Sequence, residues 1–250
     1  MNRYLSAAVL VCTAPVILCG CTKRSEMVAP PDRQYLVKRA TGPIVLDGDL
    51  SDAAWKNAER TGAFGFANGQ GGTPRYRTEA MMLWDDQNLY IGFEVEDNDI
   101  WAGYTRDQEP LYDEEVVEFF ANPNDDMREY YEFQVNPVNA HFTAFFTQHR
   151  SDLKQAMQWS GPWKSAVKVN GNVNKRDGRD KGWSVEMVLP FSMFQVIGGK
   201  APKQGSHWRA DMFRFERPSR GKITEAHGWA PTPSWDFHSM KDWGWIVFGP

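Results

Sequence analysis

Apolar and polar residues alternate along many short stretches of this 250-residue chain, a pattern that indicates strands with one buried and one exposed face. The stretch 89–96 is the clearest case, because large apolar residues occupy every second position between Tyr, Gly and Glu. Residues 85–88, Asp-Asp-Gln-Asn, form a turn signal between this stretch and the apolar run 80–84, so the two runs predict a β-hairpin. The other predicted strands are 44–46, 116–120, 130–136, 141–147, 165–169, 183–189, 208–216 and 243–248.

Many short strands separated by turns, with no sustained helical period, predict an all-β fold. The expected architecture is an antiparallel β-sandwich of immunoglobulin-like or jelly-roll type with one or two short helices. One short helix begins after an Asp-Gly turn, with Ser51 or Asp52 as its cap and Trp55 on its inner side. The other is a single turn at 190–194, which begins with proline.

The stretch 112–120 places a carboxylate among apolar residues. On a strand, Glu118 shares a face with Val116 and Phe120, while Val117 and Phe119 point to the other face. A carboxylate held against apolar neighbours needs hydrogen-bond partners or a ligand, because burying it unpaired costs several kcal/mol. Two interpretations follow: an ion pair with one of the arginines, or a contact with a bound ligand.

The predicted strand 130–136 carries a row of hydrogen-bonding side chains on one face. Glu132, Gln134 and Asn136 fall on that face together with Tyr130, and the opposite face is apolar. Such a row on a rigid sheet suits a polyhydroxylated ligand. It favours the ligand interpretation for the neighbouring strand.

The N-terminal residues have the features of an export signal. Arg3 precedes an apolar run at 5–18, which is too short to span a membrane and predicts a secretion signal. The run ends in Leu-Cys-Gly-Cys, which resembles a bacterial lipobox and implies cleavage before Cys21 and a lipid on its sulfur. We therefore expect an exported bacterial lipoprotein at the outer membrane, the cell surface or in the periplasm. Its expected segments are a signal peptide at 1–20, a tether at 21–33 and one globular domain at 34–250.

Composition narrows the range of partners. The 28 basic and 32 acidic residues nearly balance, and no basic cluster occurs, which argues against nucleic acid as a partner. Aromatic residues make up 14% of the chain, including 11 Trp. Most should lie in the core, but the long region 217–242 has aromatic residues among Pro and Gly. A loop of that length is usually functional or disordered, and its aromatic content argues against disorder.

Seven short motifs occur in a specific order. They are Leu46-Asp47-Gly48 with Asp52 and Trp55; Leu83-Trp84-Asp85-Asp86 with Leu89-Tyr90; Val117-Glu118-Phe119-Phe120; Glu132-Phe133-Gln134-Val135-Asn136; Gly182-Trp183-Ser184-Val185-Glu186 with Leu189-Pro190; Trp229 and Trp235; and Trp243-Gly244-Trp245-Ile246-Val247-Phe248. In this order they resemble the family 9 carbohydrate-binding modules, a DOMON-like group of β-sandwiches. The resemblance covers nearly all of the chain after the tether.

The resemblance implies a sugar held between two aromatic side chains, with polar strand residues that form hydrogen bonds with its hydroxyls. Trp235 and Tyr112 stand at the two aromatic positions, where Tyr112 departs from the family's tryptophan. Glu118 matches the ligand-contacting glutamate, and Gln134 stands where the sugar-binding prototype has an arginine. Aromatic faces stack on the C–H faces of a pyranose, and carboxyl or amide groups exchange hydrogen bonds with its hydroxyls. Further ligand-binding candidates are Glu132, Asn136, Trp101 and Trp229.

The expected function is therefore non-catalytic carbohydrate binding that supports polysaccharide or oligosaccharide breakdown, with glycoside hydrolases or transport proteins as partners. One alternative is a glycoside hydrolase, which needs two carboxyl groups facing each other across a bond. Glu118 with Glu132 or Glu114 could supply the pair, although nothing in their spacing favours this.

Two other functions are compatible with the residue types. A haem-binding DOMON domain needs Met and His axial ligands; the candidates are Met81 or Met82 with His141 or His149. A surface protein that uses the sandwich for protein contacts would also expose tryptophans in its loops.

The resemblance also implies structural calcium in some members. Asp97 and Asp99 are candidate ligands, because Ca²⁺ prefers several oxygen ligands. A second acidic cluster, Asp47, Asp49 and Asp52, is better explained as turn and cap residues than as calcium ligands.

Overall fold

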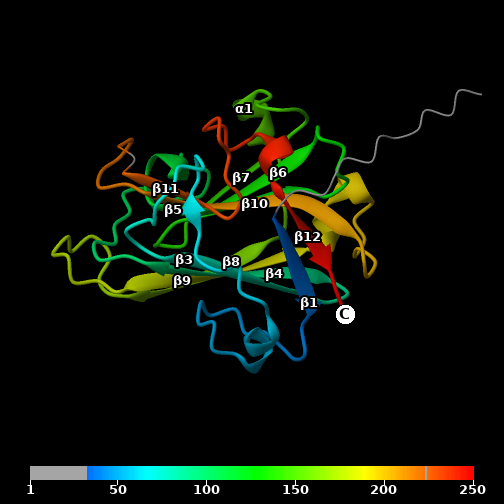
Figure 1. Cartoon of the computed structure of the whole chain (residues 1–250), viewed down its shortest axis with the longest axis horizontal. Coiled ribbons are helices and arrows are strands. Elements are labelled where there is room, and N and C mark those ends of the chain that lie inside the picture. Colours follow the sequence, from blue (N-terminus) through cyan, green and yellow to red (C-terminus); the bar gives the residue numbers. More distant parts are fainter. Residues whose placement is uncertain (1–32, 223) are drawn as a thin grey trace, which may run out of the picture.

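Two packed β layers make up the part of the chain that the computed structural model describes, residues 33–222 and 224–250 (Figure 1). Residues 1–32 lie outside it, and with them the predicted signal peptide, Cys21 and nearly all of the predicted tether. The strands are β1 (Gln34–Arg39), β2 (Gly65–Phe66), β3 (Thr78–Trp84), β4 (Asn88–Glu96), β5 (Val116–Asn122), β6 (Tyr130–Val135), β7 (His141–Phe146), β8 (Lys164–Asn170), β9 (Gly182–Pro190), β10 (His207–Glu216), β11 (Glu225–Gly228) and β12 (Gly244–Phe248).

Helical structure in these residues is limited to short turns, as predicted. The α-helix α1 (Leu153–Ala156) is one turn long. The 3₁₀ turns are Ala53–Asn57, Leu111–Asp113, Phe191–Met193, Gln195–Ile197 and Met240–Asp242. Asp52 stands at the N-cap position of the first turn, but its side chain forms no capping hydrogen bond. Its carboxylate accepts from the Val45 amide instead, at 2.7 Å. That bond explains why the predicted strand 44–46 does not form: the stretch is fixed to the turn rather than to a sheet.

The strands follow the order β7-β6-β5-β10-β12-β1-β3-β4-β9-β8, with β11 and β2 attached to β10. β1 links the two layers, because Gln34–Val37 pairs with β12 while Lys38 and Arg39 pair with β3. Both pairings of β1 are parallel, whereas the other strand pairs in the described residues are antiparallel. The sheet therefore curls at β1 to form a mostly antiparallel sandwich, and this corner strand was not predicted.

The core lies between the layers. The inward residues predicted for the hairpin, such as Ile91 and Phe93 on β4, are fully buried there. Val117 and Phe119 of β5 point into the same core, so the predicted alternation of this strand is confirmed. Burial of this many aromatic and aliphatic side chains is the dominant stabilising term for the fold.

The outer face of the β5–β6–β7–β10 layer carries a second apolar cluster. Phe120 and Tyr130 project outward from β5 and β6, and the ring of Trp243 packs on them with centroid distances of 5.4 and 5.6 Å. Trp243 ends segment 229–243, which crosses this face. The predicted long loop 217–242 therefore forms a cover, and part of it is the strand β11. Because of this cover, the polar row on β6 is buried rather than solvated.

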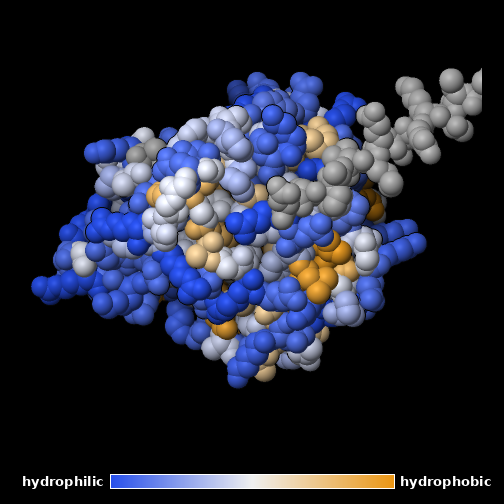
Figure 2. All heavy atoms as spheres, in the orientation of Figure 1, coloured by the Kyte–Doolittle hydropathy of each residue, from blue (hydrophilic) through white to orange (hydrophobic). Residues whose placement is uncertain are grey.

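The visible surface is mainly hydrophilic, with small separate hydrophobic patches (Figure 2). Among the described residues no helix is long and apolar enough to cross a membrane. The exposed large hydrophobic side chains are Val45, Met127, Val138, Leu153 and Trp235.

Candidate ligand-binding site

A cavity of about 270 Å³ lies on the outer face of β5 and β6, under segment 229–243. Its apolar walls come from aromatic side chains of three strands, a 3₁₀ turn and a loop. Its polar lining includes Glu118, Glu132 and Arg217. Cavities of this kind, mostly apolar with a few converging polar groups, are the usual sites of small-ligand binding.

The register of β5 and β6 brings three predicted site residues together. Glu118 lies opposite Gln134, and Phe120 lies opposite Glu132. All four side chains therefore share the outer face of the layer, as alternation requires. The side-chain amide of Gln134 donates a hydrogen bond to the Glu132 carboxyl group, which couples the two polar residues of β6.

Burial perturbs both carboxyl groups. Burial raises the pKa of Glu118 well above its usual value; the nearby Glu132 raises it further and Arg217 opposes the shift. Burial also raises the pKa of Glu132 to about 7, against the lowering effects of Gln134 and Arg150. The pair therefore carries less than its full two negative charges at neutral pH.

Several polar groups at the cavity have no protein partner. Among the described residues, Gln134 Oε1 and Arg217 Nε are buried without a hydrogen bond. The carboxyl group of Glu118 lines the same cavity, and Glu118 is only 2% exposed. Leaving a buried donor or acceptor unsatisfied costs about 1–3 kcal/mol. Ligand hydroxyls, which both donate and accept, would satisfy such a mixed set.

Aromatic side chains border the cavity on two sides. Tyr112 lines it and packs edge-on against Phe142, with ring centroids 5.5 Å apart. Trp235 is 48% exposed and packs edge-on against Phe237, a lining residue, at 6.2 Å. Trp235 also has a φ of +56°, a conformation that non-glycine residues rarely adopt outside constrained turns and functional loops. Its accessible ring beside the cavity can stack on a ligand.

Polar contacts fix the covering segment in place. The Asp236 carboxylate pairs with His149 at 2.6 Å and with the Arg150 Nε at 2.9 Å. The Tyr130 hydroxyl lies 2.8 Å from the Nδ1 of His238. Burial lowers the pKa of His238 to about 3, so its ring is neutral at physiological pH. Trp235 is thus carried on an anchored loop.

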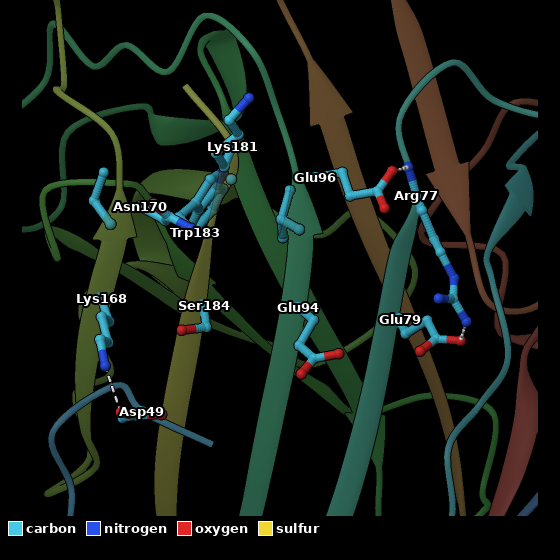
Figure 3. Close-up of a pocket in the computed structure, with 13 residues that line it drawn as sticks. Asp49, Arg77, Glu79, Glu94, Glu96, Lys168, Asn170, Lys181, Trp183 and Ser184 are labelled. Carbon is cyan, nitrogen blue, oxygen red and sulfur yellow. Dashed lines mark hydrogen bonds and ion pairs between the residues drawn. The ribbon is translucent and has the colours of Figure 1, made fainter. Parts of the chain in front are cut away.

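A larger hollow of about 480 Å³ lies on the outer face of the other layer, over β4, β8 and β9 (Figure 3). Several of its charged side chains are already engaged: Lys168 pairs with Asp49 and the Arg77 guanidinium with Glu79, while the Glu96 carboxylate accepts from the backbone amide of Arg77. Its lining has no exposed aromatic ring. The hollow therefore resembles a solvated sheet face, and the smaller cavity, with its unsatisfied polar groups, is the better site.

Three predicted ligand contacts lie away from the cavity lining. Trp229 is 3% exposed and belongs to the core between the layers. The Asn136 carboxamide is used in the turn after β6, where it accepts from the amides of Val138 and Ala140 and donates to the Tyr104 carbonyl. Trp101 is buried, and its indole N–H donates to a backbone carbonyl.

The predicted calcium ligands already have cationic partners. Arg214 donates to the Asp97 carboxylate at 2.8 Å, and Arg176 donates to that of Asp99 at 2.9 Å. Asp97 does lie close to Glu115 and Glu216, with carboxylate oxygens within 4.8 Å of one another. Arg214 pairs with two of these three groups and supplies positive charge where a cation would sit. As they stand, these side chains do not fit a bound calcium, and calcium elsewhere stays a prediction.

The candidate haem ligands are not assembled. Met82 is buried on β3 in the core, in the other layer from β7. His141 stacks on Trp163 with centroids 4.3 Å apart, and His149 is paired with Asp236. Nothing in these positions supports axial ligation of one iron.

Sequence reasoning missed several lining residues, chiefly Arg217, Phe237 and His238. A signal for Arg217 was present: Phe213, Phe215 and Arg217 alternate along and just past β10, and Phe213 lies opposite Glu118. Extending that alternation by one more position would have placed Arg217 on the face of Glu118.

Comparisons with known proteins give a consistent result. A family model described as carbohydrate family 9 binding domain-like matches residues 46–249. A curated relative, exoglucanase XynX of Acetivibrio thermocellus, is 23% identical over 158 residues, which is 63% of this chain and only 12% of that protein. The match therefore spans a small part of that relative's length.

Two solved structures of a family 9 carbohydrate-binding module from Caldicellulosiruptor kristjanssonii share the fold. The one in complex with cellotriose has a TM-score of 0.62 and 18% identity, covering 87% of this chain and 94% of that one. The one in complex with glucose has a TM-score of 0.61 and 19% identity, covering 87% and 97%.

Proposed function

Because the chain belongs to the carbohydrate family 9 binding domain-like family, we propose that the cavity under segment 229–243 binds a saccharide without cleaving it. The observation that carries the proposal is an aromatic-lined cavity whose wall holds the carboxyl group of Glu118 and the guanidinium of Arg217, with Arg217 Nε buried and without a hydrogen bond in the described residues. A sugar offers apolar C–H faces for Tyr112 and Trp235 and hydroxyls for the polar groups. Its hydroxyls would offset the cost of leaving those groups unpaired.

The arrangement of the two carboxyl groups argues for binding rather than hydrolysis. Glu118 and Glu132 project from the same face of neighbouring strands, so they form part of one wall. A glycosidase needs two carboxyl groups flanking the scissile bond, with one of them ionised as base or nucleophile. Burial raises the pKa of both groups here, so neither is favoured as that base.

The test is calorimetry of the purified protein with a panel of mono- and oligosaccharides that includes glucose and cellotriose. Glu118→Leu removes the polar atoms at similar volume and should weaken binding about 5- to 150-fold, since hydrogen bonds to ligands contribute about 1–3 kcal/mol. Glu96→Leu, on the outer face of the other layer, is the matched control and should bind as the parent does.

Two outcomes would contradict the proposal. One is a parent protein that binds no saccharide of the panel. The other is the release of new reducing ends on long incubation, lost in Glu118→Gln, which would identify a hydrolase. Unchanged oligosaccharide lengths together with measurable binding are the expected result.

We further propose that the domain acts at a bacterial membrane surface through a lipid on Cys21, close to enzymes or transporters of the same saccharide. The lipobox resemblance at residues 18–21 supports the anchor. A relative named as an exoglucanase supports the link to polysaccharide breakdown, through a match to 12% of its length.

A further inference from the structure

Arg217 occupies a distinctive place in the cavity wall. It follows directly after β10, and its guanidinium lies over the ring of Phe215, 5.2 Å from the centroid. Phe215 and Glu118 also line the cavity. The apolar ring holds the side chain from one side, so the guanidinium has little freedom to leave the wall.

The guanidinium lacks a compensating partner. Its Nε is buried without a hydrogen bond, and its guanidinium forms no ion pair with a carboxylate of residues 33–222 or 224–250. Burial lowers the pKa of Arg217, and the charges of Asp113 and Glu118 oppose this shift. Arginine nevertheless stays charged in proteins, and a partly buried cation without hydrogen-bond acceptors is costly. A bound group that accepts hydrogen bonds would offset this cost.

The backbone around Arg217 is held by residues from two other loops. The Trp101 indole N–H donates to the Arg217 carbonyl. Arg176 lies over the Trp101 ring, 5.3 Å from its centroid, and donates to the Pro218 carbonyl at 2.9 Å. Asp99 in turn accepts from Arg176. Trp101 and Asp99 are thus positioning residues, and they fix Arg217 before any ligand arrives.

We propose that Arg217 is a ligand-binding residue of this cavity and that its guanidinium binds two adjacent hydroxyl oxygens of the sugar. The inference rests on the proposed saccharide binding. A guanidinium presents parallel N–H donors in a planar fork, which matches a pair of neighbouring oxygens better than a single one. Each hydroxyl that accepts from Arg217 can donate its own proton to the carboxyl group of Glu118, which lines the same cavity. The arginine therefore comes from the residue after β10, whereas the resemblance implies one at position 134 on β6.

The test combines protein variants with deoxy sugars. The parent protein, Arg217→Met and Arg217→Lys are titrated calorimetrically with glucose and with its 2-, 3- and 4-deoxy analogues. Arg217→Met should bind glucose about 10- to 100-fold more weakly, as expected for loss of hydrogen bonds from a charged donor. Arg217→Lys should recover only part of this, because an ammonium is a point donor.

The decisive readout is non-additivity. For the parent, removal of either hydroxyl of the bound pair should weaken binding about 10-fold or more. In Arg217→Met the same two deoxy analogues should lose clearly less affinity relative to glucose than they do with the parent, because the hydrogen bonds from the guanidinium are already lost. Trp101→Phe keeps an aromatic side chain but removes the indole N–H, and should lower the discrimination against the deoxy analogues without abolishing binding.

Controls separate the failure of this inference from the failure of the proposed function. Arg39→Met removes a guanidinium that lies over another aromatic ring, that of Trp84, away from the cavity, and should not change affinity. A parent that binds no glucose would refute saccharide binding itself. Glucose binding that Arg217→Met and Arg217→Lys leave intact, additive deoxy effects, or tighter binding of glucuronate than of glucose would each overturn the role given to Arg217.

Discussion

Trp229 and Trp235 lie six positions apart in one segment and should respond to truncation in opposite ways. Trp229 is 3% exposed in the core, and its ring packs so closely on Gly244 that a Cβ there would lie 2.6 Å away. Trp235 is 48% exposed beside the cavity. We expect Trp229→Ala to affect mainly stability and Trp235→Ala to affect mainly sugar binding.

The magnitudes follow from burial. Truncating a buried Trp to Ala costs about 3–5 kcal/mol, and in a domain of this size each kcal/mol shifts the Tm by about 2–4 °C. Trp229→Ala should therefore lower the Tm by about 6–20 °C. Trp235 has only about half of its surface buried, on the order of 100 Å², so its truncation costs at most about 2.5 kcal/mol. In binding, loss of its stacking face should cost about 1 kcal/mol or more, a factor of 5 to 10 or greater.

The assay pairs a thermal melt with sugar calorimetry at a temperature well below both transitions. Trp235→Ala should melt close to the parent and bind weakly, and Trp229→Ala should melt early and bind within about twofold of the parent while folded. A Trp235→Ala variant with parental affinity for every sugar would refute its place in the site. A melt of that variant as low as that of Trp229→Ala would show that Trp235 supports the core.

Three further outcomes are expected. Burial and the neighbouring Asp97, opposed by Arg214, raise the pKa of Glu115 to about 10. The native state therefore retains a proton that the unfolded state loses near pH 4.5. The resulting contribution to stability is lost as the pH rises from about 4.5 towards 10. In chemical denaturation, the unfolding free energy of Glu115→Gln should therefore fall by about 2–3 kcal/mol less than that of the parent between pH 5 and 7. Parallel pH profiles of parent and variant would count against a buried, protonated Glu115. Gly182→Ala should destabilise the fold by at least about 1–3 kcal/mol, because Gly182 has a φ of +140° and a Cβ would lie 2.1 Å from the Val95 carbonyl oxygen; a parental melting curve would be incompatible with this strand geometry. Cys21→Ala should yield soluble protein or unprocessed precursor on membrane fractionation, and mature-sized protein that stays with the membrane would exclude lipidation at Cys21.

Alternation along the chain was sufficient to predict most of the strands and the faces of their residues. Glu118, Glu132 and Gln134 share a face because side chains on a strand have a period of two, and this holds whatever packs against that strand. The hairpin at 80–96 was predictable for the same reason, since its turn residues and alternating runs are adjacent in sequence. The order of the motifs also indicated the family, because recognising that order requires only the positions of the motifs in the sequence.

Only the tertiary structure decided which of these residues meet. Trp229 and Trp235 look alike in sequence, yet one enters the core and the other borders the cavity, because segment 229–243 crosses a layer formed by strands far away along the chain. The same crossing buries the carboxyl groups of β5 and β6 and shifts their pKa values. Arg217 joins them through pairing of β10 with β5, across about 100 residues of sequence. Pairing and covering of this kind depend on contacts between distant segments, and a local pattern of polar and apolar positions carries no information about them.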